Sequence, residues 1–389
     1  MARTTSPQGE STKPQRGIKW LKQREQRTGF LYILPAFIII FLFGLFPIVY
    51  SFYMSMFNWR VRRGSFVGLG HYFDIFGDLT GFLMFLAGIG LFVLAYNVWN
   101  KAFRSVKAGG FLARLLASVI LIAGGFVLTS GWGRMIAAGN SDFLNSLIIT
   151  LYYALGTVPL EIILGMVLAY ILFQNIKGKE IFRMIYFLPY ITPTVSTAVV
   201  FQIIFSSRET SIANMVVGFF GMDPLKWRFE PNPVSELLGL NLQGFLAGPS
   251  LALVTIMLFG IWTYVGYNAV IFLAGLGNIP QEVYEAAEID GANRFHMFRH
   301  ITMPLLSPVT FYLSLVAFIG TFKAFNHIYV LRVPSAQDSV ITASIRIFDS
   351  FYKANMYGVA TSQAIVLFLV ILGLTLVQNK IMGERVFYG

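Results

Sequence analysis

The sequence predicts an all-α integral membrane protein with about eight transmembrane helices. Of the 389 residues, 56% are hydrophobic and only 12% are charged, and the mean hydropathy is +0.67. That is about half of the ~25% charged residues of a typical soluble domain. Long apolar segments recur along the chain, each near the ~20 residues that a helix needs to cross a bilayer. Each such segment must be helical, because lipid offers no hydrogen-bond partner to an open backbone.

The apolar segments place the expected spans along the chain. They lie at roughly 30–53, 80–99, 111–131, 144–173, 181–205, 250–276, 307–330 and 362–381. The third is the least apolar, because Arg114, Gly124 and Gly125 interrupt it. We expect kinks rather than helix ends at three prolines inside spans, which are Pro159, Pro189 and Pro193.

Basic residues orient the predicted bundle. An even number of spans puts both termini on one side, and if that side is the cytoplasm, most Lys and Arg residues lie inside. A cluster at 60–63 opposes this bias, but the larger cluster between Lys19 and Arg27 outweighs it. We therefore expect cytoplasmic termini and a basic cytoplasmic tail at 1–29. The net charge of +11 is then a topology signal, and its dispersal over both sides argues against nucleic-acid binding.

The most informative motif lies at 279–308, between two apolar segments. Three glutamates enter a helix early, where the helix dipole favours negative charge, and Gly291 is a natural helix stop. The pattern predicts a short cytoplasmic helix, a glycine turn and a second short helix. Such a loop can transmit motion to a soluble partner through these residues: Glu285, Ala286, Ala287, Asp290, Gly291, Ile301 and Pro304.

This motif resembles the EAA loop of permease subunits of bacterial ATP-binding-cassette (ABC) importers, with Met303 where that family usually has Leu. Other segments resemble sugar permeases of the maltose and glycerol-phosphate type, among them Leu34-Pro35-Ala36 and Phe187-Leu188-Pro189-Tyr190. The resemblance covers most of 30–75 and 140–382. It implies a type I importer permease with its core at 144–382, in the bacterial cytoplasmic (inner) membrane. It also implies alternating access driven by ATP, with three partners: a second homologous permease, a dimeric ABC ATPase and an extracytoplasmic solute-binding protein.

The sequence favours a non-catalytic subunit. It has no Gly-rich loop ending in Lys-Ser/Thr, so we expect no cofactor on this chain, with ATP and Mg²⁺ held by the partner ATPase. His296 and His300 are four apart but lack the acidic partner of a zinc motif, so we expect no metal site. An ion-gradient-driven secondary transporter or a channel subunit fits the composition but leaves the EAA motif unexplained.

The resemblance also implies a substrate path midway through the core, between the spans at 181–205, 250–276 and 307–330. The matching positions mix hydroxyls and aromatic rings, as a sugar or polyol requires: Tyr190, Thr194, Thr263, Tyr264, Tyr267 and Thr321. The alternative is that these side chains only bridge helices. Lys323 is added because an ionisable group inside a span is a functional candidate. It either snorkels to the outer surface or faces the cavity, where it would favour an anionic substrate such as a glycerol phosphate.

Two features lie outside the resemblance. Residues 80–131 form an inserted transmembrane hairpin with a basic cytosolic turn at 101–107, near the point where related maltose permeases carry a soluble periplasmic domain. Its role is either packing against lipid or contact with another subunit. Glu161 lies inside the fourth span, where we expect a helix-to-helix hydrogen bond or pair whose partner the sequence does not identify.

Overall fold

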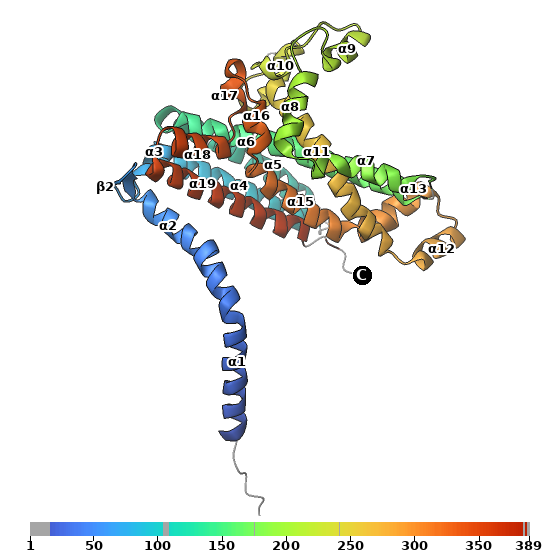
Figure 1. Cartoon of the computed structure of the whole chain (residues 1–389), viewed down its shortest axis with the longest axis horizontal. Coiled ribbons are helices and arrows are strands. Elements are labelled where there is room, and N and C mark those ends of the chain that lie inside the picture. The colour runs from blue at the N-terminus through green and yellow to red at the C-terminus, as the bar shows by residue number, and fades with distance from the viewer. Residues whose placement is uncertain (1–15, 104–108, 175, 241, 384–385, 387–389) are drawn as a thin grey trace, which may run out of the picture. The chain divides into compact units, whose positions relative to one another are not determined.

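The computed structural model describes residues 16–103, 109–174, 176–240, 242–383 and 386 (Figure 1). Among these residues, six helices are long and apolar enough to cross a membrane, and there are eight crossings if each of two bent helix pairs counts as one. The predicted all-α membrane fold is confirmed. Most of the expected turn at 101–107 and the first half of the expected tail at 1–29 lie outside the described residues.

The chain divides into two compact units, residues 1–54 and 55–389. The described part of the first unit is one helical stretch, with α1 (Arg16–Ile40), a π-helical turn (Phe41–Leu45) and α2 (Phe46–Ser55), whose last residue begins the second unit. Its apolar part, Gln23–Ser55, is longer at both ends than the expected span at 30–53. The π turn lies just before Pro47, whose missing N–H removes one regular helical hydrogen bond.

The second unit opens with a two-stranded hairpin, β1 (Phe57–Trp59) and β2 (Arg63–Phe66), and with α3 (Gly70–Phe76). The inserted helices follow as α4 (Leu79–Phe103) and α5 (Gly109–Ala138), packed against each other. Glycines allow the close approach, since a Cβ at Gly88 would lie 2.6 Å from the Leu128 Cβ. The helix α5 extends beyond residue 131 to Ala138, and Arg134 on it forms a 2.7 Å ion pair with Asp78.

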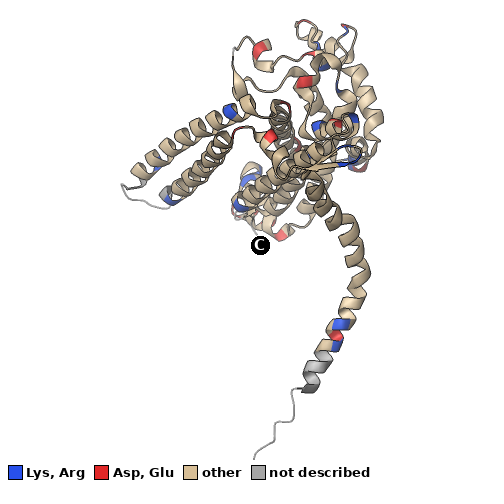
Figure 2. Ribbon diagram, turned by 90° about the vertical axis from the view of Figure 1, so that its left-hand side faces the viewer, with Lys and Arg blue, Asp and Glu red and all other residues tan. Residues whose placement is uncertain are grey.

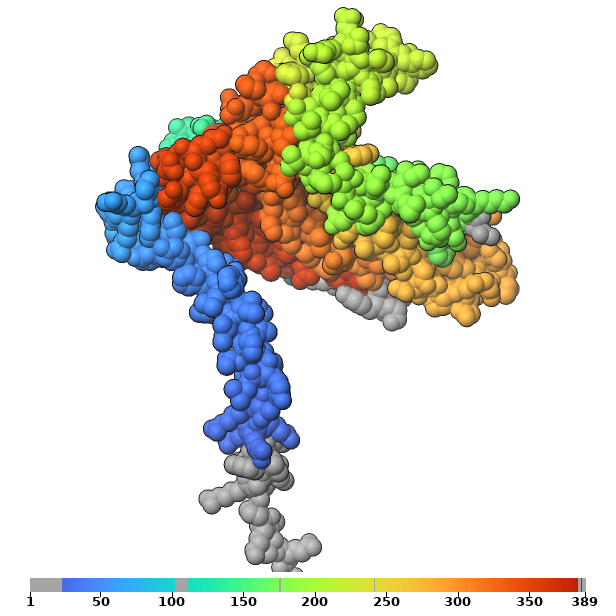
Figure 3. All heavy atoms as spheres, viewed as in Figure 1, coloured from blue at the N-terminus to red at the C-terminus, as the bar shows by residue number. Residues whose placement is uncertain are grey.

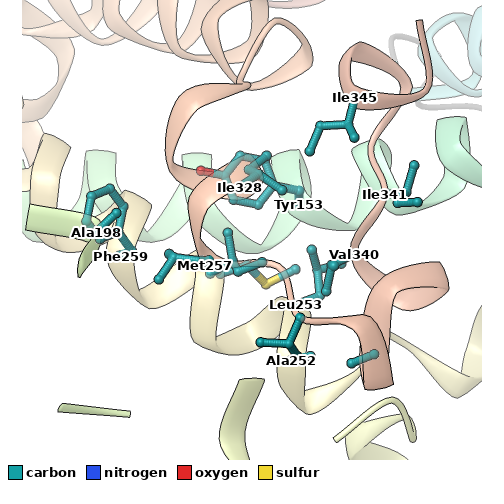
Figure 4. Close-up of a cluster of buried hydrophobic side chains, with 14 of the residues drawn as sticks. Tyr153, Ala198, Ala252, Leu253, Met257, Phe259, Ile328, Val340, Ile341 and Ile345 are labelled. Carbon is teal, nitrogen blue, oxygen red and sulfur yellow. The ribbon is translucent and has the colours of Figure 1, made fainter. Parts of the chain in front are cut away.

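The core of the second unit is built on α6 (Ser141–Phe173) and α11 (Leu251–Gly277), which pack along their length. α15 (Ser307–Phe322) and α19 (Tyr357–Gln378) complete it. Figure 4 shows side chains from separate segments converging at one end of this seam, with Tyr153 from α6, Met257 from α11 and Ile328 from α16 (Asn326–Leu331). Pro159 lies within α6 without ending it, as expected.

Two expected spans are wrong as single helices. The segment 181–205 consists of α7 (Lys179–Ile191) and α8 (Thr194–Ile204), which meet at 98°. Thr192 is extended (ψ 140°) because a residue before a proline avoids the helical region, so Pro193 marks a break, whereas Pro189 stays inside α7. The segment 307–330 is also broken, because α15 ends at Phe322 and α16 starts only at Asn326.

Short helices join the long ones. Residues 206–250 form a lobe with α9 (Ile212–Phe219) and α10 (Val234–Leu237), which projects from the bundle in Figure 3. Asn214 holds this lobe together, accepting from Trp227 Nε1 at 2.7 Å and from the Leu225 backbone at 2.9 Å. α17 (Gln337–Val340) and α18 (Ala343–Phe348) precede α19. Figure 2 shows the charged residues mostly at helix ends and in connecting segments, as expected for membrane-spanning helices.

Candidate substrate path and coupling segment

A cavity of about 360 Å³ lies where the two broken helices meet the core. Six of the seven side chains expected along a substrate path line it: Tyr190, Thr194, Tyr264, Tyr267, Thr321 and Lys323. They come from α7, α8, α11 and the end of α15, so the fold brings together residues that are far apart in the sequence. The volume falls at the lower end of the ~300–1,000 Å³ typical of small-molecule sites.

Three tyrosines form an aromatic wall of the cavity. The Tyr190 ring stacks on the Tyr267 ring, with centroids 4.6 Å apart and planes 26° apart, and it meets the Tyr264 ring edge-on at 5.9 Å. Gly266 permits this arrangement, because a Cβ there would collide with the backbone carbonyl oxygen of Tyr186 on α7. The sequence therefore places a glycine where α7 must approach α11 closely.

The break after α15 positions Lys323 on the cavity. Lys323 is the first residue after α15, its side chain is exposed, and it forms no ion pair with any described residue. The break is held in place by Ser344, whose hydroxyl donates to the Ala324 carbonyl oxygen. Phe325 adds ring contacts with Phe348 at 4.7 Å. The cavity wall therefore carries one free ammonium group on a fixed backbone.

Thr263 does not line this cavity. Its side chain is 8% exposed, and its hydroxyl donates to the Phe259 carbonyl oxygen at 2.8 Å within α11. Thr263 and Tyr264 are neighbours on the helix, so they point about 100° apart, and packing decides which one faces the cavity. Thr263 was predicted because its position matches the family's path and lies four residues before Tyr267, but only Tyr267 of this pair lines the cavity.

Five polar lining residues were not among the predicted path residues: Tyr153, Glu161, Asn268, Asn326 and His327. Tyr153 and His327 share a buried 2.7 Å hydrogen bond, and the Phe259 ring stacks on His327 at 5.2 Å. Asn268 could have been found from its spacing, because it lies four residues after Tyr264 on the same helix face. Asn326 and His327 follow Lys323 closely, but the intervening break hid their orientation.

The predicted coupling segment has the expected local structure. It consists of α12 (Gln281–Ile289), a glycine turn and α13 (Arg294–Met297). Gly291 has φ +78°, the left-handed conformation that closes a helix, and Asn293 caps α13 by accepting from His296 N at 2.8 Å. The Glu285 side chain is exposed and accepts only from Gln281, at 2.8 Å, among the hydrogen bonds of the described residues.

The coupling segment continues directly into the cavity wall. A π-helical turn (Phe298–Thr302) and α14 (Met303–Leu305) follow α13, and a 62° bend leads into α15, which ends at Phe322, directly before Lys323. Pro304 explains the wide turn, because it has no N–H for a regular helical bond. Tyr284 of α12 and Thr302 share a 3.1 Å hydrogen bond, so α12 is tied to the start of this path.

The long helices, the central cavity and the exposed loop define a multi-pass membrane permease component. The family described as "Binding-protein-dependent transport system inner membrane component" matches residues 161–387. The chain belongs to this family, and the membership expected from the EAA motif is confirmed. The matched range includes every predicted coupling and path residue.

The relatives include proteins named for sugar transport. The chain is 33% identical to the arabinooligosaccharides transport system permease protein AraP of Bacillus subtilis (strain 168) over 65% of this chain and 76% of the relative. It is 25% identical to the trehalose/maltose transport system permease protein MalF of Thermococcus litoralis over 93% and 95%. The fold also matches a solved bacterial ABC transporter that imports the acidic polysaccharide alginate, with TM-score 0.58, 17% identity and coverage of 94% and 98%.

Proposed function

We propose that this chain is the permease subunit of an ATP-driven importer for a sugar or related polyol. The observation that carries the proposal is the cavity, where three tyrosines, two threonines and Lys323 from four helical segments surround one space. Sugars bind to such surfaces through hydrogen bonds and flat aromatic faces. The relatives named for arabinooligosaccharides and for trehalose and maltose support the same substrate class.

Energy is supplied by a partner ATPase dimer that docks on the coupling segment. Exposed apolar side chains, with Ile289 87% and Phe295 69% exposed, flank the glycine turn and suit insertion into a groove of another protein. Glu285, Ala286, Ala287, Asp290 and Gly291 make the docking surface, while Ile301 and Pro304 shape the path that leads to α15. Motion at α12 reaches the cavity through Tyr284, Thr302 and α15.

A second homologous permease completes the translocation path, and a solute-binding protein delivers the sugar on the opposite side from α12. The family name supports the binding-protein partner. With eight crossings, both termini lie in the cytoplasm, together with α12 and α13. The residues 206–250 and the β1–β2 hairpin then face outward.

ATP-dependent uptake by the assembled complex tests this function. Proteoliposomes holding both permeases, the ATPase and the binding protein are supplied with arabinotriose or maltotriose. We expect uptake when ATP is present on the side of the membrane that carries the ATPase. We expect no uptake with a proton or sodium gradient alone. Uptake that follows the ion gradient without ATP would instead assign a secondary transporter.

A further inference from the structure

Glu161 and Asn268 form a buried polar pair in the cavity wall, one on α6 and the other on α11. Glu161 is 3% exposed and Asn268 is 2% exposed, and both line the cavity. Glu161 forms no ion pair with any residue in the part of the chain that the structure describes. An ionised carboxyl group without a counter-ion is unfavourable at this depth, so Glu161 lies on the cavity as a neutral carboxyl group that can both donate and accept a hydrogen bond.

Asn268 has an unused hydrogen-bond donor. It is the polar neighbour of Glu161, but its amide nitrogen Nδ2 is buried and makes no hydrogen bond of adequate geometry within the described residues. Buried polar atoms in native proteins nearly always have partners, so an exception needs an explanation. A hydrogen-bond acceptor on a ligand in the cavity would pair with this amide nitrogen.

The helix packing keeps the pair from rearranging to satisfy itself. A Cβ at Gly165 would lie 2.7 Å from the Asn268 Cβ, so the α6 and α11 backbones are in close contact one turn from Glu161. A Cβ at Gly260 would lie 2.6 Å from the Tyr153 hydroxyl, so α6 and α11 also approach each other closely at this second position. These contacts hold Glu161 and Asn268 in a fixed position on the cavity, which is the property of a preorganised binding site.

We propose that Glu161 and Asn268 bind adjacent hydroxyl groups of an uncharged sugar residue and thereby set the specificity of the cavity. A neutral carboxyl group donates to one hydroxyl and accepts from its neighbour, and the amide nitrogen donates to a hydroxyl or ring oxygen. A substrate carboxylate at this position would instead lose its hydration beside Glu161 and Asn268, neither of which supplies a counter-ion. This inference rests on the proposed function, and it specifies which class of substrate the same cavity binds.

The test compares three probes in the reconstituted complex: arabinotriose, maltotriose and a mannuronate trisaccharide. Their ATP-dependent uptake is measured for the parent, for Glu161→Gln and for Asn268→Leu, with KM and maximal rate separated. We expect KM for the neutral probes to rise roughly 10- to 100-fold in both variants, because each changes a buried hydrogen-bonding group that faces the substrate.

Gln363→Leu is the matched control. Gln363 on α19 is 1% exposed and has an unpaired Oε1, but it lies outside the cavity. This variant should keep the parent's KM, since it removes a buried polar group that no substrate reaches. Equal KM changes in all three variants would show a general packing effect and overturn the assignment.

Other outcomes separate this inference from the proposed function. Parent-like KM in both Glu161→Gln and Asn268→Leu, with active uptake, overturns the inference alone. Uptake of only the mannuronate probe by the parent also overturns it and points to Lys323 as the selecting charge. A parent complex that hydrolyses ATP but imports none of the three probes contradicts the proposed function and the inference together.

Discussion

The Tyr190 ring of α7 stacks on the Tyr267 ring of α11 with 4.6 Å between centroids, and this contact depends on a glycine at position 266. Tyr267 follows Gly266 directly. The glycine that permits α7 to approach α11 is therefore adjacent to the tyrosine whose ring stacks across that contact. The aromatic wall of the cavity and the α7–α11 packing are therefore one structural feature.

Gly266→Ala should separate α7 from α11 and open the tyrosine stack. The added methyl collides with the Tyr186 carbonyl oxygen, and overpacking of this kind costs ~1–3 kcal/mol. We expect a lower melting temperature of the purified complex and a loss of sugar uptake of at least about tenfold. Gly277→Ala, on the same helix with open space around it, should behave like the parent.

Tyr267→Ala and Lys323→Met should each impair uptake in intact complexes. Loss of the Tyr267 ring removes an aromatic face, and loss of the Lys323 ammonium removes a hydrogen-bond donor from the cavity wall. We expect roughly tenfold lower uptake efficiency for each, measured at several sugar concentrations. Thr263→Val is the control, since its hydroxyl is satisfied within α11, and unchanged kinetics in the first two variants would remove the cavity from consideration.

Glu285→Ala and Gly291→Val should uncouple transport from ATP hydrolysis. Glu285 is exposed and available for a charge-assisted contact with a basic ATPase residue, worth ~1–3 kcal/mol. A valine cannot easily adopt φ +78°, at a cost of roughly 1–2 kcal/mol. ATPase activity stimulated by the binding protein, compared with uptake in the same preparation, gives the readout.

Gly221→Val controls for backbone strain in that experiment. Gly221 also has a positive φ, +74°, but lies in the 206–250 lobe, away from the coupling segment. It should preserve the ratio of uptake to ATP hydrolysis. If Glu285→Ala and Gly291→Val both assemble and transport like the parent, the segment has been misassigned.

Removing the inserted hairpin should leave the topology intact, because two crossings are lost together. We expect a variant without α4 and α5 (residues 79–138) to keep a reporter fused after Gly389 in the cytoplasm. Its stability should fall, since Met135 is 1% exposed and belongs to a core cluster with Phe143 and Leu144. A C-terminal reporter found outside the cytoplasm would contradict the eight-crossing arrangement.

The sequence predicted the spans well because the bilayer imposes a minimum length and an apolar composition on each one. It also predicted the glycine turn at Gly291, since a positive φ is a local property. The break after Phe322 was not predicted, because Phe325, Ile328 and the apolar residues that follow extend the segment to the length of one span while the backbone leaves the helix. Tertiary contacts, such as that of Ser344 with Ala324, hold this break.

Some of the residues that line the cavity could be predicted from the sequence, and others could not. Tyr190, Tyr264 and Tyr267 were found because their side-chain types match the family's path, and all three lie on the cavity. Thr263 was assigned to the path but lies off the cavity, and Asn268 lines it without having been predicted, because the face that a residue presents depends on which neighbouring helices surround it. The position of Glu161 opposite α11 is set by glycine contacts, such as Gly165 with Asn268, that sequence spacing alone does not reveal.

Substrate protection of a single cysteine tests most directly whether this cavity is the sugar path. The chain contains no Cys, so T321C gives one reactive thiol on the cavity wall once the partner subunits are also made cysteine-free. We expect a polar thiol reagent to modify it in the assembled complex, and arabinotriose or maltotriose with the binding protein and ATP to slow that reaction roughly tenfold. The same sugars should leave L369C, on the exposed face of α19, unaffected. Modification of T321C at one rate with and without a transported sugar would contradict the account.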